Sequence, residues 1–167
     1  DADMRRPRLH KSFATLGDAG LSTAVVGESS LEHSIRATDI ENLALLPCGP
    51  IPPNPAELLH AKRFQALLTE ARNDFDYIII DSPQTGVVTD SLILASMVDG
   101  VVIVAWAGKT TQPMLRQAGR QIVDVGGRVL GVVLNNVNLN NARYGSYYYY
   151  YYRSGYGYGD EKDRAAS

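Results

Sequence analysis

Three short, continuous apolar runs, separated by segments with helical spacing, dominate the hydrophobic pattern of this chain. The runs cover residues 77–80, 100–105 and 129–134. Runs without polar alternation are typical of strands buried on both faces of a parallel sheet. Between them, residues 91–97 and 111–125 carry apolar positions three and four apart, which predicts helices. The pattern therefore predicts an α/β fold, in which a parallel sheet is flanked by helices and built with right-handed crossovers.

The first 75 residues give weaker signals than the rest. Residues 9–13 predict a short helix, whereas residues 21–40 are ambiguous between strand and helix. Residues 43–46 predict a short buried strand, and residues 49–55, with four prolines, predict an extended loop. A clear amphipathic helix is predicted for residues 56–72.

No core pattern remains beyond residue 137, which predicts a globular domain at 1–137 and a disordered tail at 138–167. All but one of the ten tyrosines lie in this tail: Tyr144, Tyr147, Tyr148, Tyr149, Tyr150, Tyr151, Tyr152, Tyr156 and Tyr158. Exposed phenols on a flexible tail suggest phosphate acceptors. The alternative is a sticky low-complexity segment of stacking aromatic rings.

Composition narrows the possible classes of protein. A net charge of −2 gives no reason to expect nucleic acid as the main partner. The single cysteine, Cys48, excludes an intramolecular disulfide and is compatible with a reducing cytosol. No apolar run reaches the length of about 18 residues that a transmembrane helix needs. No signal peptide is visible, and the start at Asp1 rather than at a methionine suggests a fragment of a longer protein.

Two acidic clusters lie where a parallel sheet binds ligands, at the carboxyl ends of strands. Asp81 directly follows the run 77–80, and a carboxylate there can hold a water of nucleotide-bound Mg²⁺. The alternative is that Asp81 only caps the following turn. Asp1 and Asp3, with arginines close by, could serve metal, base and phosphate roles, or could belong to a solvated polar loop.

One segment imitates a phosphate-binding loop. Residues 108–110, Gly-Lys-Thr, follow a predicted strand and precede a predicted helix. The phosphate loop requires a glycine five positions before the second glycine, and that position is Ile103, inside the strand. We therefore reject residues 105–108 as a phosphate loop, because the connection is too short to wrap a phosphate.

Several segments together resemble the cytoplasmic catalytic domain of the bacterial tyrosine kinases that control capsule and exopolysaccharide export. These kinases belong to the MinD/ParA-like branch of the P-loop ATPases. Residues 1–7 (DADMRRP) resemble their Walker A′ motif, and residues 75–83 (FDYIIIDSP) resemble their Walker B motif. Residues 49–59 match a proline-rich stretch typical of these kinases, residues 99–104 and 131–135 match later strands, and the tyrosine cluster resembles their autophosphorylation tail.

The resemblance implies a P-loop NTPase-like fold, ATP and Mg²⁺ as cofactors, and tail tyrosines phosphorylated between subunits of a homo-oligomer. It implies that Asp81 and Asp3 hold or orient Mg²⁺, that Asp1 or Asp3 is the base for the tyrosine hydroxyl, and that Asn135 approaches the adenine. It further implies a membrane activator of the polysaccharide co-polymerase type, a cognate tyrosine phosphatase and a place at the cytoplasmic face of the plasma membrane.

Two departures from the family pattern keep other interpretations open. Gln84 stands where the family usually has a second proline, and the 167 residues contain no G-x-x-x-x-G-K-[ST] loop and no strand before Asp1. We therefore expect the carboxyl-terminal part of a kinase, inactive alone because the phosphates lack a cradle. One rival is a MinD/ParA-like ATPase without kinase activity. The other is a non-catalytic module that presents tyrosines to an intact kinase.

Overall fold

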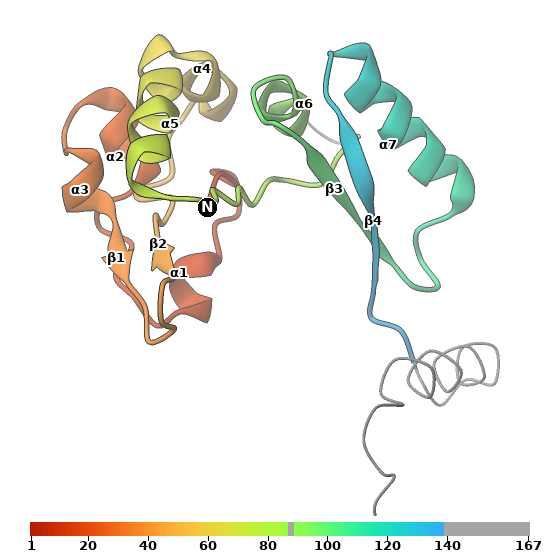
Figure 1. Ribbon diagram of the computed structural model, residues 1–167, viewed down its shortest axis with the longest axis horizontal. Helices are drawn as coiled ribbons and strands as arrows, with labels where there is room; N and C mark the ends of the chain where they lie inside the picture. Colours follow the sequence, from red (N-terminus) through yellow and green to blue (C-terminus); the bar gives the residue numbers. More distant parts are fainter. Residues whose placement is uncertain (87–88, 139–167) are drawn as a thin grey trace, which may run out of the picture.

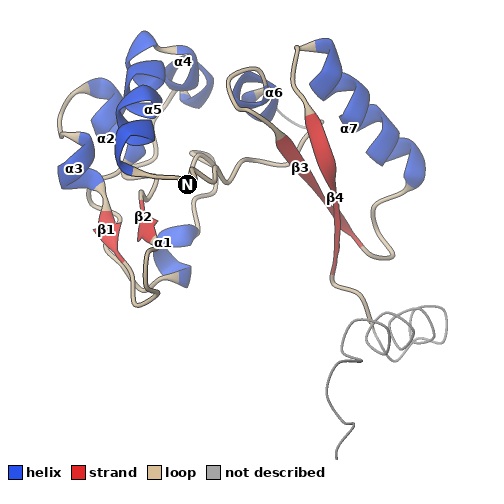
Figure 2. Cartoon of the chain, viewed as in Figure 1, coloured by secondary structure: helices blue, strands red, loops and turns tan. Residues whose placement is uncertain are grey.

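The computed structural model describes residues 1–86 and 89–138, which form two groups of elements joined through one helix (Figure 1). The helical group contains α1 (Leu9–Ser12), α2 (Leu21–Val26), α3 (Leu31–Ser34), β1 (Arg36–Ala37), β2 (Ala44–Leu45), α4 (Pro55–His60) and α5 (Lys62–Asp74). The sheet group contains β3 (Val101–Trp106), α7 (Gln112–Asp124) and β4 (Val129–Asn135). Helix α6 (Asp90–Ala95) lies between the two groups and packs against α4 and α7 (Figure 2).

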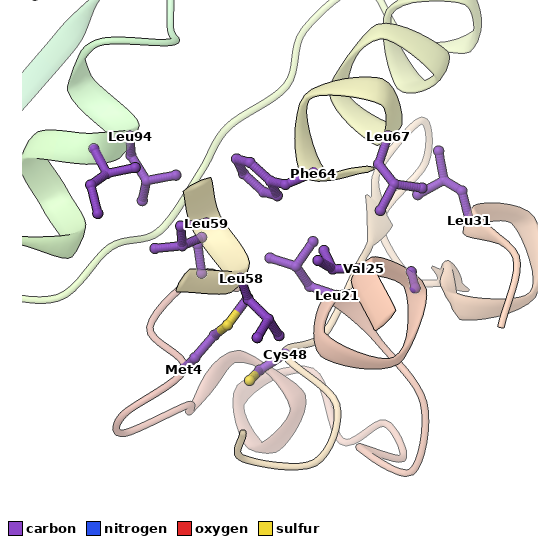
Figure 3. Packing of buried hydrophobic residues seen from close by; sticks show 13 residues of the cluster. Met4, Leu21, Val25, Leu31, Cys48, Leu58, Leu59, Phe64, Leu67 and Leu94 are labelled. Carbon is purple, nitrogen blue, oxygen red and sulfur yellow. The ribbon is translucent and has the colours of Figure 1, made fainter. Parts of the chain in front are cut away.

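A single hydrophobic cluster holds the helical group together and reaches into α6 (Figure 3). Its members come from the first four residues, from α2 to α6 and from the loop after β2: Ala2, Met4, Leu21, Ala24, Val25, Leu31, Cys48, Leu58, Leu59, Phe64, Leu67, Ile93 and Leu94. Met4 and Leu59 are completely buried, so the acidic amino-terminal segment is part of this core.

The amphipathic segment predicted as one helix forms two. Helices α4 and α5 are separated at Ala61, whose backbone is extended with φ −62° and ψ 139°. The break changes the direction of the chain, so that Leu59 of α4 and Phe64 of α5 enter the same cluster. Tertiary packing therefore overrides a helical pattern that contains no glycine or proline at the break.

The ambiguous segment after residue 20 begins as a helix, because the loop after β2 supplies partners for its first backbone amides. Leu21 N donates to Pro47 O and Ser22 N donates to Cys48 O, both at 2.8 Å. A Cβ atom at Gly20 would lie 2.2 Å from Pro47 O, so only glycine permits this close approach.

The sheet group confirms the predicted strand–helix–strand unit but not its burial. Strands β3 and β4 pair in parallel, and α7 connects them. The prediction that both strands are buried on two faces is wrong, since the side chain of Val104 is 64% exposed and that of Leu130 is 58% exposed. Within residues 1–86 and 89–138 no third strand pairs with either, so solvent takes the place of a neighbouring strand or helix.

The run at 77–80 also departs from its prediction. It is extended but joins no ladder in the described part of the chain, and Tyr77 and Ile79 are 88% and 91% exposed. A buried strand needs neighbours on both sides, and only Ile80, at the end of the run, packs against the core cluster. The fold is therefore mixed α/β with a small parallel sheet, rather than the larger sheet that the three apolar runs predict.

The predicted tail at 138–167 lies outside the described residues from position 139 onward, and so do all of its tyrosines. The division into a domain at 1–137 and a tail stays a prediction. Within the described ranges, no helix combines the length and apolarity needed to cross a membrane.

Candidate active site

The backbones that carry Asp1 and Asp81 run side by side. Ala2 N donates to Asp81 O at 2.9 Å, and on the other side Asp1 N donates to Leu46 O at 2.8 Å. Residues 1–2 therefore lie between the end of the β2 segment and the end of the extended run. This arrangement brings the acidic positions of both predicted clusters to the same place.

Alternation along the first four residues turns the two acidic side chains away from the core. Ala2 and Met4 are 1% and 0% exposed and belong to the hydrophobic cluster, whereas Asp1 and Asp3 are half-buried. Successive side chains of an extended backbone point to opposite sides, so Asp1 and Asp3 share the side opposite the core. The packing of Met4 thus contributes to the orientation of both carboxylates.

Backbone amides hold one oxygen of each of these carboxylates. Asp1 Oδ2 accepts from the amides of Arg8 and Leu9, both at 3.0 Å, at the start of α1. Asp3 Oδ1 accepts from the amides of Arg5 and Arg6, at 3.2 and 3.0 Å. Asp1 Oδ1 is buried and has no hydrogen-bond partner in the described part of the chain, so it is an acceptor oriented in place without a donor.

These few carboxylates fit a Mg²⁺ ion that also binds phosphate oxygens better than a metal ion held by protein ligands alone. Among residues 1–86 and 89–138, no three or more His, Cys, Asp or Glu side chains are grouped closely enough to hold a metal ion. Mg²⁺ in nucleotide sites usually takes one or two carboxylates and fills its other positions with phosphate oxygens and water. Asp3 and the exposed Asp81 could supply those carboxylates.

An ion pair between a buried carboxylate and a half-exposed arginine lies beside this site. Arg5 Nε and Nη2 donate to Asp90 Oδ2 and Oδ1 at 2.8 and 3.0 Å, and the Asp90 side chain is completely buried. The hydrogen bond to Asp90 raises the pKa of the Arg5 guanidinium above its ordinary value. Sequence analysis missed Asp90, because an acidic residue at the start of a helix is common on electrostatic grounds alone. The pairing with Arg5, 85 positions away, left no local signal.

Asn135 is the last residue of β4 and pairs with Trp106, the last residue of β3. It therefore lies at the carboxyl end of the parallel strand pair. Its Oδ1 accepts from the amide of Asn136 at 2.8 Å, and its side chain is exposed. No hydrogen bond joins it to Asp1, Asp3 or Asp81 in the described ranges. Its predicted approach to an adenine stays a prediction.

Residues 108–110, whose sequence resembles the end of a phosphate loop, form a tight turn. The amides of Lys109 and Thr110 both donate to Trp106 O, at 3.1 and 2.9 Å, and Gly108 has a φ of +77°. The Lys109 ammonium lies 4.6 Å from the centre of the Trp106 ring. The turn leaves no backbone loop around a phosphate, in agreement with the rejection of this segment.

Comparison with known proteins now adds to this geometry. The chain is 38% identical to the tyrosine-protein kinase CpsD of Streptococcus agalactiae over 148 residues, which is 88% of this chain and 65% of CpsD. Its structure matches the kinase domain of VpsO with a TM-score of 0.79 at 34% identity, covering 83% of this chain and 68% of that one. The chain belongs to the bacterial tyrosine kinase family.

A third similarity concerns the chimerical protein CapA2B2, whose crystal structure matches this kinase-family chain with a TM-score of 0.78 and 34% identity. The match covers 82% of this chain and 61% of the chimera. No family model matches the chain. This member of the bacterial tyrosine kinases spans 65% of the length of CpsD, so about a third of that relative has no counterpart among its residues.

Proposed function

We propose that this chain is the larger part of the catalytic domain of a protein-tyrosine autokinase, which transfers the γ-phosphoryl group of ATP to its own tail tyrosines. The observation that carries the proposal is the meeting of two acidic segments, where Ala2 N donates to Asp81 O. Family membership supports the choice of tyrosine kinase over other nucleotide chemistry. Regulation of capsule or exopolysaccharide polymerisation and export would be the role of such a kinase.

In this proposal the three carboxylates divide the work. Asp81 and Asp3 hold or orient Mg²⁺, which neutralises charge on the phosphate oxygens when bound. Asp1 accepts the proton of the tyrosine hydroxyl, the phenolic oxygen forms a bond to the γ-phosphorus, and the bond from that phosphorus to the β,γ-bridging oxygen breaks to release ADP. Asp3 is the alternative base, with Asp1 then beside the metal.

The tyrosine acceptors are those of the tail: Tyr144, Tyr147, Tyr148, Tyr149, Tyr150, Tyr151, Tyr152, Tyr156 and Tyr158. A flexible coil of about 30 residues, which the sequence predicts for 138–167, has a root-mean-square reach of roughly 30 Å. That reach favours phosphorylation of a neighbouring subunit in a homo-oligomer, because residues close to the domain fold back into their own site with difficulty. Asn135 would contribute to adenine binding.

Phosphoryl transfer also needs backbone amides and a lysine around the β- and γ-phosphates, and the 167 residues contain no loop of that type. We propose that a polypeptide segment outside these residues supplies it. The same observation favours a second candidate function, a non-catalytic module that presents tyrosines to an intact kinase. A MinD/ParA-like ATPase is a third candidate, which the family membership disfavours.

The proposed partners follow from the family. The match to the chimerical protein CapA2B2 supports association with a membrane activator of the CapA type, which would place the domain at the cytoplasmic face of the plasma membrane. A cognate tyrosine phosphatase would reset the tail. Nucleic acid is not proposed as a partner, since the net charge of −2 offers no basic surface in excess.

The test compares the chain alone with a fusion in which a phosphate-loop segment from CpsD precedes Asp1. Isothermal titration of the chain alone should show no ATP binding, whereas the fusion should accumulate phosphotyrosine with ATP and Mg²⁺. Asp81→Asn in the fusion should lower the rate by about 10²-fold or more, because it removes a charge that orients the metal.

Asp76→Asn is the matched control, since Asp76 is an exposed carboxylate on the same segment. It should leave phosphotyrosine formation unchanged. Undiminished phosphotyrosine in Asp81→Asn would remove Asp81 from the proposed site. A fusion that binds ATP but transfers nothing, even to tyrosine in trans, would favour the tyrosine-presenting module.

A further inference from the structure

The Arg5–Asp90 ion pair links the segment that carries Asp1 and Asp3 to helix α6. Arg5 lies two residues after Asp3, and Asp90 is the first residue of α6, in the part of the chain that follows Asp81. Both Asp90 oxygens accept from Arg5, at 2.8 and 3.0 Å. A two-point contact between planar groups fixes their relative orientation as well as their distance.

The pair differs from every other ion pair in the described part of the chain. Asp90 is 0% exposed, whereas the carboxylates of Asp18 and Asp99, which pair with arginines elsewhere, are 68% and 94% exposed. Exposed pairs are screened by water and constrain little. A completely buried carboxylate depends on its partner, because an isolated charge away from water is strongly unfavourable.

The backbone of Arg5 connects this pair directly to the site. The Arg5 amide donates to Asp3 Oδ1 at 3.2 Å, so one residue binds α6 through its side chain and Asp3 through its backbone. Between them, Met4 is buried in the cluster that contains Leu94 of α6. On the other side, Ala2 N bonds to Asp81 O, so the amino-terminal segment is held both to Asp81 and to α6.

We infer that Arg5 and Asp90 are positioning residues, whose two-point contact at the buried Asp90 carboxylate holds the carboxylates of Asp3 and Asp81 in fixed relative positions for phosphoryl transfer. Asp90 is not itself a candidate for contact with ATP or tyrosine, because it is buried and both of its oxygens bind Arg5. The kinetic consequence of this inference rests on the proposed function, while its structural consequence does not.

The structural consequence is tested on the 167-residue chain by amide hydrogen exchange, measured by NMR. Asp90→Asn removes the charge and one acceptor with little change of shape. It should accelerate exchange of the Ala2 amide, which bonds to Asp81, by about tenfold through local opening. Asp99→Asn is the matched control at the exposed pair with Arg72, and it should leave exchange of the Ala2 amide unchanged.

The kinetic consequence is tested in the fusion that carries a phosphate loop. Asp90→Asn should lower kcat by about 10- to 100-fold with little change in KM for ATP, because misplaced reacting groups slow the chemical step more than binding. Arg5→Lys keeps the charge but loses the planar group that binds both carboxylate oxygens, and should give an intermediate kcat. Combining both changes should add little to the larger single effect, since the two residues act as a unit.

Wild-type exchange of the Ala2 amide in Asp90→Asn would overturn the inference, and so would an equal loss of kcat in Asp99→Asn. If Asp90→Asn does not fold, Arg5→Lys carries the same exchange test, because Asp90 keeps a cation beside it. If the unmodified fusion forms no phosphotyrosine, the proposed function fails while the exchange experiment still decides whether the pair positions the acidic segments.

Discussion

Both the helical group and the sheet group contain many apolar side chains, which are buried in the first and exposed in the second. In the cluster formed by the helical group and α6, residues from seven different segments meet, and Phe64 and Leu59 are 1% and 0% exposed. In the sheet group, Val102 and Val133 belong to regular strands yet are 51% and 52% exposed. Regular backbone pairing is therefore no guarantee of burial.

The difference shows which of two requirements each group meets. A β-strand forms when the backbone has one partner, and the parallel register of β3 with β4 supplies it. Burial requires a covering layer on each face, and α7 packs against β4 without closing the sheet. The helical group meets both requirements: β1 pairs with β2, and α6 covers the hydrophobic cluster on the side that faces the sheet group (Figure 1).

Truncation of one core and one sheet side chain should give the largest contrast between the groups. Phe64→Ala should lower the free energy of unfolding by about 3–5 kcal/mol, because it opens a cavity in a packed core. Val133→Ala should change it by about 0.5 kcal/mol or less, as for an exposed position. Urea unfolding of both variants measures the difference, and equal losses would show that the sheet group is covered in solution.

Replacing one glycine in each group by alanine compares how tightly the two backbones are packed. Gly20→Ala should cost about 1–3 kcal/mol, because the new Cβ would lie 2.2 Å from Pro47 O and force a shift. Gly131→Ala in β4 should be neutral, or stabilise by about 0.4–1 kcal/mol, since no atom lies within 4 Å of the added Cβ. Thermal unfolding distinguishes these outcomes, and a destabilising Gly131→Ala would indicate a neighbour against that face.

The smallest change in the free energy of unfolding is expected when a charged residue replaces an exposed apolar residue of β3. Val104 is 64% exposed on β3, so Val104→Lys should leave the free energy of unfolding nearly unchanged. It should reduce self-association, because an apolar strand without a second neighbour pairs readily with other chains and lysine opposes this. Light scattering against concentration provides the measurement. Val104→Thr is the control for size without charge, and identical scattering by all three proteins would contradict the prediction.

Local signals were sufficient to predict most of the helices. Residues 111–125 contain α7, with Thr111 accepting from Met114 N at its start, and residues 91–97 overlap α6. Both elements depend on the spacing of apolar residues and α7 also on its cap, and these are local properties. The break at Ala61 could not be predicted, because it depends on the direction in which α4 and α5 meet the cluster.

Burial was predicted less well than secondary structure, and the run 77–80 shows why. Its apolar residues are typical of a central strand, but Ile79 is 91% exposed because no strand in the described ranges pairs with it. A sequence pattern reports what a segment can pack against, while burial requires that the partner be present.

For the candidate site, sequence analysis located the acidic residues but not their supports. Asp1, Asp3 and Asp81 were predicted from the family motifs and from the apolar run before Asp81, and the bond from Ala2 to Asp81 brings their segments together. The partner of Arg5 could not be found, since Asp90 is 85 positions away in the sequence. Contacts of that separation depend on the completed fold.

The placement of the chain's only tryptophan has an optical consequence. Trp106 ends β3 with its side chain 44% exposed, and the Lys109 ammonium lies 4.6 Å from its ring centre. Indole fluorescence depends on contact with water, so tryptophan emission, excited apart from that of the ten tyrosines, reports on the sheet group. The cation should make iodide a better quencher than caesium, and any polypeptide or ligand that covers this end of β3 should shift the emission to shorter wavelength.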